Sequence, residues 1–146
     1  MTDSLNNLLL KGEQAMQSGD TLVALLQLEM AHALRPLPGI KSKLAFCMAK
    51  ERRQFQKALE LCREALAAEP NNPDHYYQLS RIYLVAGQKT HAIKSLRKGL
   101  KFKRHQPIID ELNRLGARKD PVFSSLPREH FLNRSLGILL CRLGSR

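Results

Sequence analysis

Apolar residues recur every three or four positions along most of the chain, which is the spacing of an amphipathic helix. They fall into blocks of about a dozen residues, and short polar or glycine-containing breaks separate the blocks. Each pair of blocks has one break between its first and its second block. In chain order these breaks are Gly19–Asp20, Arg53–Gln54 and Gly87–Gln88. The pattern therefore predicts pairs of helices, each pair joined by a tight turn.

The helix pairs repeat with a period of 34 residues. Small residues mark the period in the second helix of each pair, where a neighbouring helix approaches closely. They are Ala24, Ala58 and Ala92 at one position, and Ala31, Ala65 and Gly99 at another. Pro36 and Pro70 end the first two pairs, and Asn72–Pro73 is a typical helix start. Three copies of one helical unit predict a solenoid.

These residues give the chain a resemblance to tetratricopeptide repeat (TPR) proteins with three repeats. The third copy is the most similar to the family pattern, at Tyr76, Leu79, Ser80, Tyr83, Gly87, Ala92, Leu96 and Gly99. The resemblance covers roughly residues 5–104 and implies an all-α, right-handed superhelical array of helix-turn-helix repeats. We place the three repeats within residues 1–106, at about 5–38, 39–72 and 73–106.

The second repeat is the least regular of the three. Its first helix fits the family pattern best with Leu44 and Ala45 at the large and small positions, which implies a shortened connection at Pro36–Gly39. That register also requires one extra residue near Arg52–Arg53. The alternative register places Phe46 at the small position.

Beyond the array, residues 107–116 are predicted to form a capping helix, residues 117–127 a loop, and residues 128–146 a terminal amphipathic helix. The stripe of the last helix consists of Leu132, Leu136, Leu139, Leu140 and Leu143. We expect this stripe to dock on the array, with self-association as an alternative and contact with a membrane surface as the least favoured one. The C-terminal residues are also similar to the tails of small bacterial TPR proteins.

In the TPR family the first helix of each repeat lines a concave groove. The resemblance assigns these groove positions to Leu9, Glu13, Met16, Phe46, Lys50, Tyr77, Arg81 and Leu84. Their mixture of large apolar and charged side chains suits a peptide or helix of a partner protein. The competing interpretation is that the C-terminal helix covers the apolar part of the groove.

Two specialised roles in the family fit the chain poorly. One subclass grips a C-terminal carboxylate with Lys, Asn and Arg, whereas the corresponding positions here hold Leu9, Glu13, Lys43, Asp74 and Gln78. Translocator chaperones of type III secretion have a similar apolar groove. However, the basicity and the C-terminal extension of this chain depart from that class, so it remains a minor alternative.

Charge distinguishes the two halves of the chain, which has 146 residues, 43% of them hydrophobic, and a formal net charge of +11. Residues 1–88 hold ten basic and nine acidic residues, whereas residues 89–146 hold fourteen and four. A basic surface is predicted in the second half of the third repeat. It consists of Lys94, Arg97, Lys98, Lys101, Lys103 and Arg104. An acidic partner protein is therefore expected, with nucleic acid as the second candidate.

Catalytic motifs are missing from the sequence, since the five histidines are scattered and no nucleophile or phosphate-binding motif occurs. Cys47, Cys62 and Cys141 lack the spacing of a zinc site. We therefore expect a non-enzyme without cofactor or metal. Neither a membrane-spanning run nor a signal peptide is recognisable, so a cytoplasmic location is expected.

Overall fold

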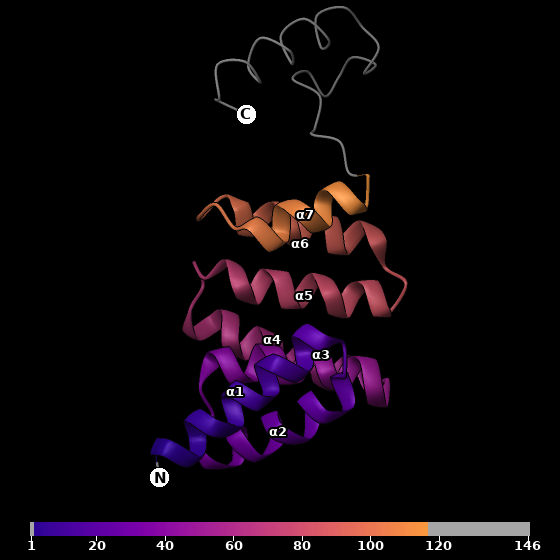
Figure 1. Cartoon of the computed structure of the whole chain (residues 1–146). Coiled ribbons are helices and arrows are strands. Elements are labelled where there is room, and N and C mark those ends of the chain that lie inside the picture. Colours follow the sequence, from indigo (N-terminus) through magenta and orange to yellow (C-terminus); the bar gives the residue numbers. More distant parts are fainter. Residues whose placement is uncertain (1, 117–146) are drawn as a thin grey trace, which may run out of the picture. The chain divides into compact units, whose positions relative to one another are not determined.

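Seven α-helices make up the part of the chain that the computed structural model describes, residues 2–116. They are α1 (Thr2–Ser18), α2 (Thr21–Leu34), α3 (Pro38–Arg52), α4 (Phe55–Ala68), α5 (Pro73–Val85), α6 (Lys89–Leu100) and α7 (Gln106–Arg114). Helices α1 and α2, α3 and α4, and α5 and α6 pack as pairs, and α7 packs on α6 (Figure 1). The predicted all-α array of helix pairs is thus confirmed. The expected loop at 117–127, the terminal helix at 128–146 and Cys141 lie outside the described residues.

One residue in the left-handed region follows the first helix of every pair. The φ angles are 83° at Gly19, 57° at Arg53 and 76° at Gly87, so the turns are spaced by the repeat period. Glycine adopts this conformation readily, whereas a residue with a Cβ atom pays roughly 1–2 kcal/mol. Arg53 lies one position further from the start of its helix at Pro38 than Gly87 lies from Pro73, so the second repeat holds one extra residue before this turn, as the sequence led us to expect.

The connection that precedes α3 is shortened, as the sequence predicted. Residues 35–37 join α2 to α3, whereas residues 69–72 join α4 to α5. The predicted helix start at Asn72–Pro73 is also confirmed. The Asn72 side chain accepts a hydrogen bond from the Asp74 amide at 3.0 Å, and Pro73 occupies the first turn, where its missing N–H costs nothing.

The small residues that mark the period lie where helices meet. Ala31 and Ala65 have no exposed surface, and Gly99 is also buried. A Cβ atom at Gly99 would lie 2.7 Å from Cδ1 of Ile108 and 2.9 Å from Cβ of Tyr76. Glycine at this position therefore allows both α5 and α7 to approach α6, and Ile108 becomes fully buried.

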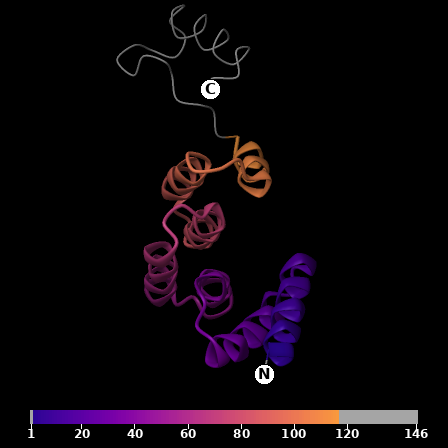
Figure 2. The same cartoon turned by 90° about the vertical axis from the view of Figure 1, so that its left-hand side faces the viewer.

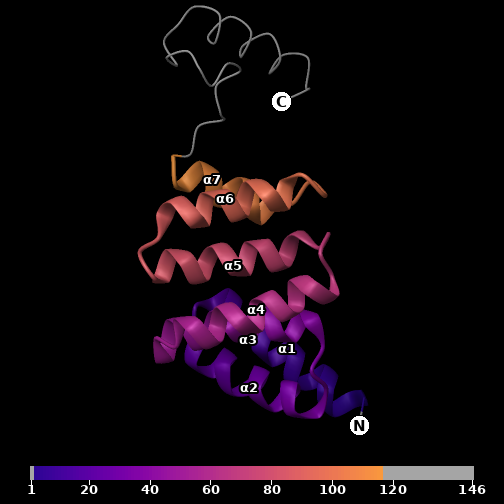
Figure 3. The same cartoon turned by 180° about the vertical axis from the view of Figure 1, so that it is seen from behind.

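The first junction between pairs differs from the second. Helix α5 packs against both helices of the preceding pair, α3 and α4, whereas α3 packs mainly against α2. Figure 2 views α3 to α7 nearly along their axes, while α1 and α2 run across the view. Seen from behind, the second helices α2, α4 and α6 are nearer the viewer (Figure 3). The first pair is therefore turned relative to the rest of the array.

Candidate peptide-binding groove

The turned first pair divides the predicted groove residues into two groups. Leu9 and Met16 of α1 are half-buried and pack against the core between the helices. Glu13 is exposed and forms an ion pair with Lys43 of α3. None of these three α1 residues lines the pocket formed by the other group, so the structure does not bring all eight groove residues together.

The other five predicted residues line one pocket of about 280 Å³. They are Phe46 and Lys50 from α3, and Tyr77, Arg81 and Leu84 from α5. Val85 of α5 and two residues of α7, Glu111 and Arg114, complete the lining. We call this site the α3–α5–α7 pocket.

Arg81 is the central charge of the α3–α5–α7 pocket. Its guanidinium carbon lies 3.5 Å from the ring centroid of Phe46 and 5.5 Å from that of Tyr77. Nη1 donates a hydrogen bond to Oε1 of Gln78 at 3.2 Å. Burial lowers the pKa of Arg81 from its usual value, although a guanidinium stays charged at any physiological pH. Within residues 2–116, no carboxylate forms an ion pair with this cation.

The remaining charges of the pocket are mostly positive. Lys50 is exposed at the rim. Arg114 pairs with Glu111 through two contacts, one of which joins Nε to Oε2 at 2.9 Å, and this pairing raises the pKa of Arg114. Glu111 is the one acidic residue in the lining. The pocket therefore keeps an excess of positive charge.

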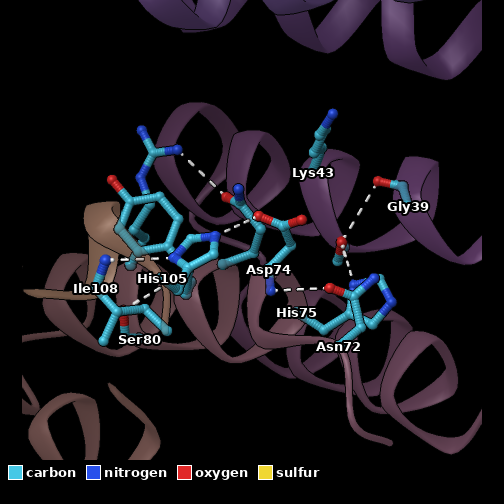
Figure 4. Close-up of polar contacts among 12 residues, drawn as sticks. Gly39, Lys43, Asn72, Asp74, His75, Ser80, His105 and Ile108 are labelled. Carbon is cyan, nitrogen blue, oxygen red and sulfur yellow. Dashed lines mark hydrogen bonds and ion pairs between the residues drawn. The ribbon is translucent and has the colours of Figure 1, made fainter. Parts of the chain in front are cut away.

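Polar residues at the carboxylate-clamp positions are already engaged within the array. Lys43 pairs with Glu13, and Gln78 accepts the hydrogen bond from Arg81. The carboxylate of Asp74 lies 2.7 Å from Nε2 of His105, and Figure 4 shows the two side chains facing each other. Lys43, Gln78 and Asp74 are thus all engaged in contacts within the array.

His75, near the start of α5, forms contacts that hold helices together and does not line the α3–α5–α7 pocket. The ring is fully buried, and its Nδ1 lies 2.9 Å from Oγ of Ser42 (Figure 4). Its Nε2 lies 2.9 Å from Oε2 of Glu69. Hydrogen bonds from Asn72 and His75 lower the pKa of Glu69. Both ring nitrogens thus tie the start of α5 to its neighbours, and neither faces the pocket.

The predicted basic surface is exposed over most of its length. Lys94 and Lys98 lie on α6 and, with Arg63 of α4, line a pocket of about 510 Å³ beside Tyr76. Lys101, Lys103 and Arg104 are exposed after the end of α6, whereas Arg97 is half-buried. The basic surface therefore begins on α6 and continues into the residues that follow this helix.

Sequence reasoning missed an apolar surface on the outer side of α2. Five large apolar residues are between 41% and 56% exposed there, namely Leu22, Val23, Leu26, Met30 and Leu34. The available signal was the composition of Thr21–Leu34, in which four of fourteen residues are polar. A helix that is apolar on its inner and its outer face needs a partner on both faces.

The two cysteines within residues 2–116, Cys47 and Cys62, are free and buried. No group of His, Cys, Asp or Glu side chains in this part of the chain suits a metal ion. Burial raises the pKa of Cys47 to about 11 and that of Cys62 to about 12, so both thiols stay protonated. Among the same residues, no helix is long and apolar enough to cross a membrane.

The helix pairs, the buried small residues and the capping contact of α7 define an α-solenoid repeat protein. The tetratricopeptide repeat family model matches residues 49–112. The crystal structure of the TPR domain of P58(IPK) is similar, with a TM-score of 0.59 and 21% identity over 78% of this chain. This chain spans 33% of that one, and the likeness shows the fold alone. No curated protein sequence matches the chain. Residues 49–112 are thus similar to tetratricopeptide repeats, the described helices have the TPR fold, and this fold supports protein–protein interaction in general.

Proposed function

We propose that the chain is a non-catalytic adaptor that binds an acidic segment of another protein in the α3–α5–α7 pocket. The observation that carries this proposal is the environment of Arg81. Its charge is half-buried against Phe46 and Tyr77, and no carboxylate within residues 2–116 forms an ion pair with it. A carboxylate supplied by a partner would form charge-assisted hydrogen bonds with this fixed guanidinium.

The walls of the pocket favour a segment that also carries a large apolar side chain. Tyr77, Leu84 and Val85 are half-buried and offer contact area beside the charge. Tyrosine and arginine are the residues that most often dominate binding energy at interfaces. We therefore infer that the bound segment places Asp or Glu next to Leu, Phe or a similar residue.

The charge of the C-terminal half supports the same partner chemistry. Fourteen basic and four acidic residues between positions 89 and 146 give this half an attraction for acidic molecules. Such long-range attraction raises the association rate more than it raises the final affinity. The pocket would then hold the segment after the encounter.

Binding of two labelled probe peptides by the full chain tests the proposal. One peptide alternates glutamate with leucine and phenylalanine, and the other carries lysine in place of every glutamate. The acidic peptide is expected to bind, and Arg81→Gln or Tyr77→Ala to weaken it about tenfold or more, which is about 1.4 kcal/mol. Equal binding of the two peptides, or full affinity in both variants, would contradict the proposal.

Lys11→Gln is the matched control because Lys11 is exposed on α1 and does not line the pocket. Phe46→Ala is a poor test because Phe46 is only 3% exposed. Its truncation would destabilise the fold by about 3–5 kcal/mol, and lost binding would then have two explanations.

Nucleic acid is a second candidate ligand, favoured by the basic surface. Lys94, Lys98, Lys101, Lys103 and Arg104 are exposed, and none of them forms an ion pair within residues 2–116. Phe102 is the one aromatic residue in the run from Lys94 to Arg104, so contacts to phosphates rather than stacking on bases would carry the binding.

Fluorescence anisotropy with labelled DNA and RNA of unrelated sequences distinguishes this candidate. Binding to nucleic acid predicts an affinity that falls steeply with salt and falls further in Lys94→Gln/Lys98→Gln/Lys101→Gln. If no binding is detected at low salt, the basic surface serves protein partners or solvation instead.

A further inference from the structure

The outer face of α2 carries the largest group of exposed apolar side chains within residues 2–116. At 100° per residue, its six most outward positions fall within one third of the helix circumference. They are Leu22, Val23, Leu26, Met30, Ala33 and Leu34, and all six are exposed and uncharged. Leu37, which is 38% exposed, continues this group beyond the helix end. We call these seven residues the α2 face.

The α2 face lies at the open end of the solenoid. Helix α2 packs against α1 and α3, and the opposite side of α2 meets no other helix among residues 2–116 (Figures 1 and 3). A solenoid end normally presents a polar outer face to water. The polar residues Gln27, Glu29 and His32 are instead half-buried at the margins of α2.

The area of the α2 face is large for a surface in contact with water. Its exposed side chains amount to roughly 500 Å² of apolar surface, near the upper end of the patches that monomers show. Two such faces would bury on the order of 1,000 Å² together, which reaches the lower bound of specific interfaces. The face is therefore large enough to hold two proteins together.

The opposite charges at the two ends of helix α2 favour a second copy of the chain as the partner. Asp20 precedes the helix and accepts a hydrogen bond from the Val23 amide at 3.1 Å, Arg35 follows the helix, and both side chains are exposed. When two copies of α2 pack in antiparallel orientation, each Asp20 lies toward the Arg35 of the other copy. The two helix dipoles also oppose each other in this arrangement.

The spacing of the apolar residues fits the same arrangement. Leu22, Leu26 and Met30 form a ridge four residues apart, which is the ridge that interdigitates in the commonest helix packing. The midpoint between Asp20 and Arg35 falls next to Leu28, close to the middle of the ridge. An antiparallel pair centred there places Leu26 of one copy near Met30 of the other.

We propose that the α2 face is the interface of a two-fold symmetric dimer of this chain. The interface is isologous, so each copy contributes the same residues. It uses no residue of the α3–α5–α7 pocket, so the dimer carries two such pockets and can bind a partner with two acidic segments by avidity. The dimer is therefore testable separately from the proposed function.

Sedimentation velocity of the full chain over a concentration series tests the dimer. The wild type is expected at twice the monomer mass of 16.6 kDa in the range of ~1 to 100 µM. Leu26→Glu/Met30→Glu is expected to weaken association at least about 100-fold, because four carboxylates would be buried without partners. The thermal unfolding midpoint of that variant should match the midpoint of the wild type measured at a concentration low enough for the wild type to be monomeric.

A mixing experiment identifies the occupant as a second copy. Leu26→Lys/Met30→Lys is expected to be monomeric alone and to form a mixed dimer with Leu26→Glu/Met30→Glu, since opposite charges then meet across the two-fold axis. Lys94→Glu/Lys98→Glu places the same change at the corresponding positions of α6 and should leave the dimer intact.

Three results would overturn the proposal. A dimer that survives Leu26→Glu/Met30→Glu must use another surface. Failure of the two charged variants to associate would exclude the antiparallel arrangement. A wild type that stays monomeric at ~100 µM, and whose thermal midpoint falls in the glutamate variant, would assign the α2 face to residues 128–146 of the same chain.

Discussion

The second helices of the three repeats share one inner face and differ on the outer one. Leu28, Cys62 and Leu96 occupy one inner position of the repeat, and each has no exposed surface. The outer positions are Leu26, Glu60 and Lys94 in one row, and Met30, Glu64 and Lys98 in the next, and all six are exposed. The same backbone thus presents an apolar surface in the first repeat, an acidic one in the second and a basic one in the third.

The outer charges also differ in how far the array satisfies them. Glu64 forms an ion pair with Lys41 at 2.7 Å, and this contact lowers the pKa of the carboxyl. Lys94 and Lys98 form no ion pair within residues 2–116. The outer face of α2 is therefore apolar and exposed, and the outer face of α6 carries two lysines without an ion pair in residues 2–116. The inner positions specify the fold, whereas the outer positions are free to specify partners.

Truncating an inner and an outer residue of one helix should separate these two roles most clearly. Leu96→Ala is expected to lower the free energy of unfolding by about 3 kcal/mol, because it leaves a cavity between helices. Lys94→Ala, two residues earlier on the exposed side, should change it by less than about 0.5 kcal/mol. Urea denaturation followed by circular dichroism measures both values. Similar losses in the two variants would show that the outer face contributes to the fold.

Adding a methyl group at Gly99 tests the close approach of α5 and α7 to α6. Gly99→Ala is expected to destabilise the chain by about 1–3 kcal/mol, because the new Cβ would collide with Tyr76 and Ile108. Gly39→Ala is the control, since a Cβ atom at that position would enter open space and the φ angle there is negative. That variant should gain about 0.5 kcal/mol from its higher helix propensity. A neutral Gly99→Ala would mean that α7 moves away freely.

Exchanging turn residues between repeats should have the smallest effect. Arg53→Gly is expected to stabilise the chain by about 0.5 kcal/mol, because glycine relieves the left-handed conformation. The gain is limited by the loss of a long hydrogen bond to the Val85 carbonyl at 3.4 Å and of the contact with the Phe55 ring. Gly87→Ala should lose about 1 kcal/mol, and urea denaturation followed by circular dichroism measures both variants. If Arg53→Gly destabilised the chain, those contacts would outweigh the backbone strain.

The repeat period predicted the fold because it records which residues meet between helices. Ala31, Ala65 and Gly99 were expected to be small because neighbouring helices approach closely at these positions. In the structure all three residues are buried where helices meet. Phe46 and Tyr77 were assigned to one groove because regular stacking places successive first helices side by side. This holds for α3 and α5, which pack against each other.

The remaining features depend on packing that the period does not record. Residues Leu9, Glu13 and Met16 were assigned to the same groove. Of the two helices in the first pair, however, α3 packs mainly against α2, and none of these three α1 residues lines the α3–α5–α7 pocket. Glu111 and Arg114 join the pocket because the burial of Ile108 fixes the position of α7. The α2 face was visible in the composition of Thr21–Leu34, but apolar residues have the same spacing in a core and at an interface.

Chemical-shift mapping of the full chain with the acidic probe peptide tests the central claim most directly. We expect the largest amide shifts on α3, α5 and α7 around Tyr77, Arg81 and Leu84, and we expect Arg81→Gln to reduce them strongly at the same peptide concentration. Shifts centred on Leu9, Glu13 and Met16 of α1, or on Lys94 and Lys98 of α6, would contradict the assignment of the α3–α5–α7 pocket as the binding site.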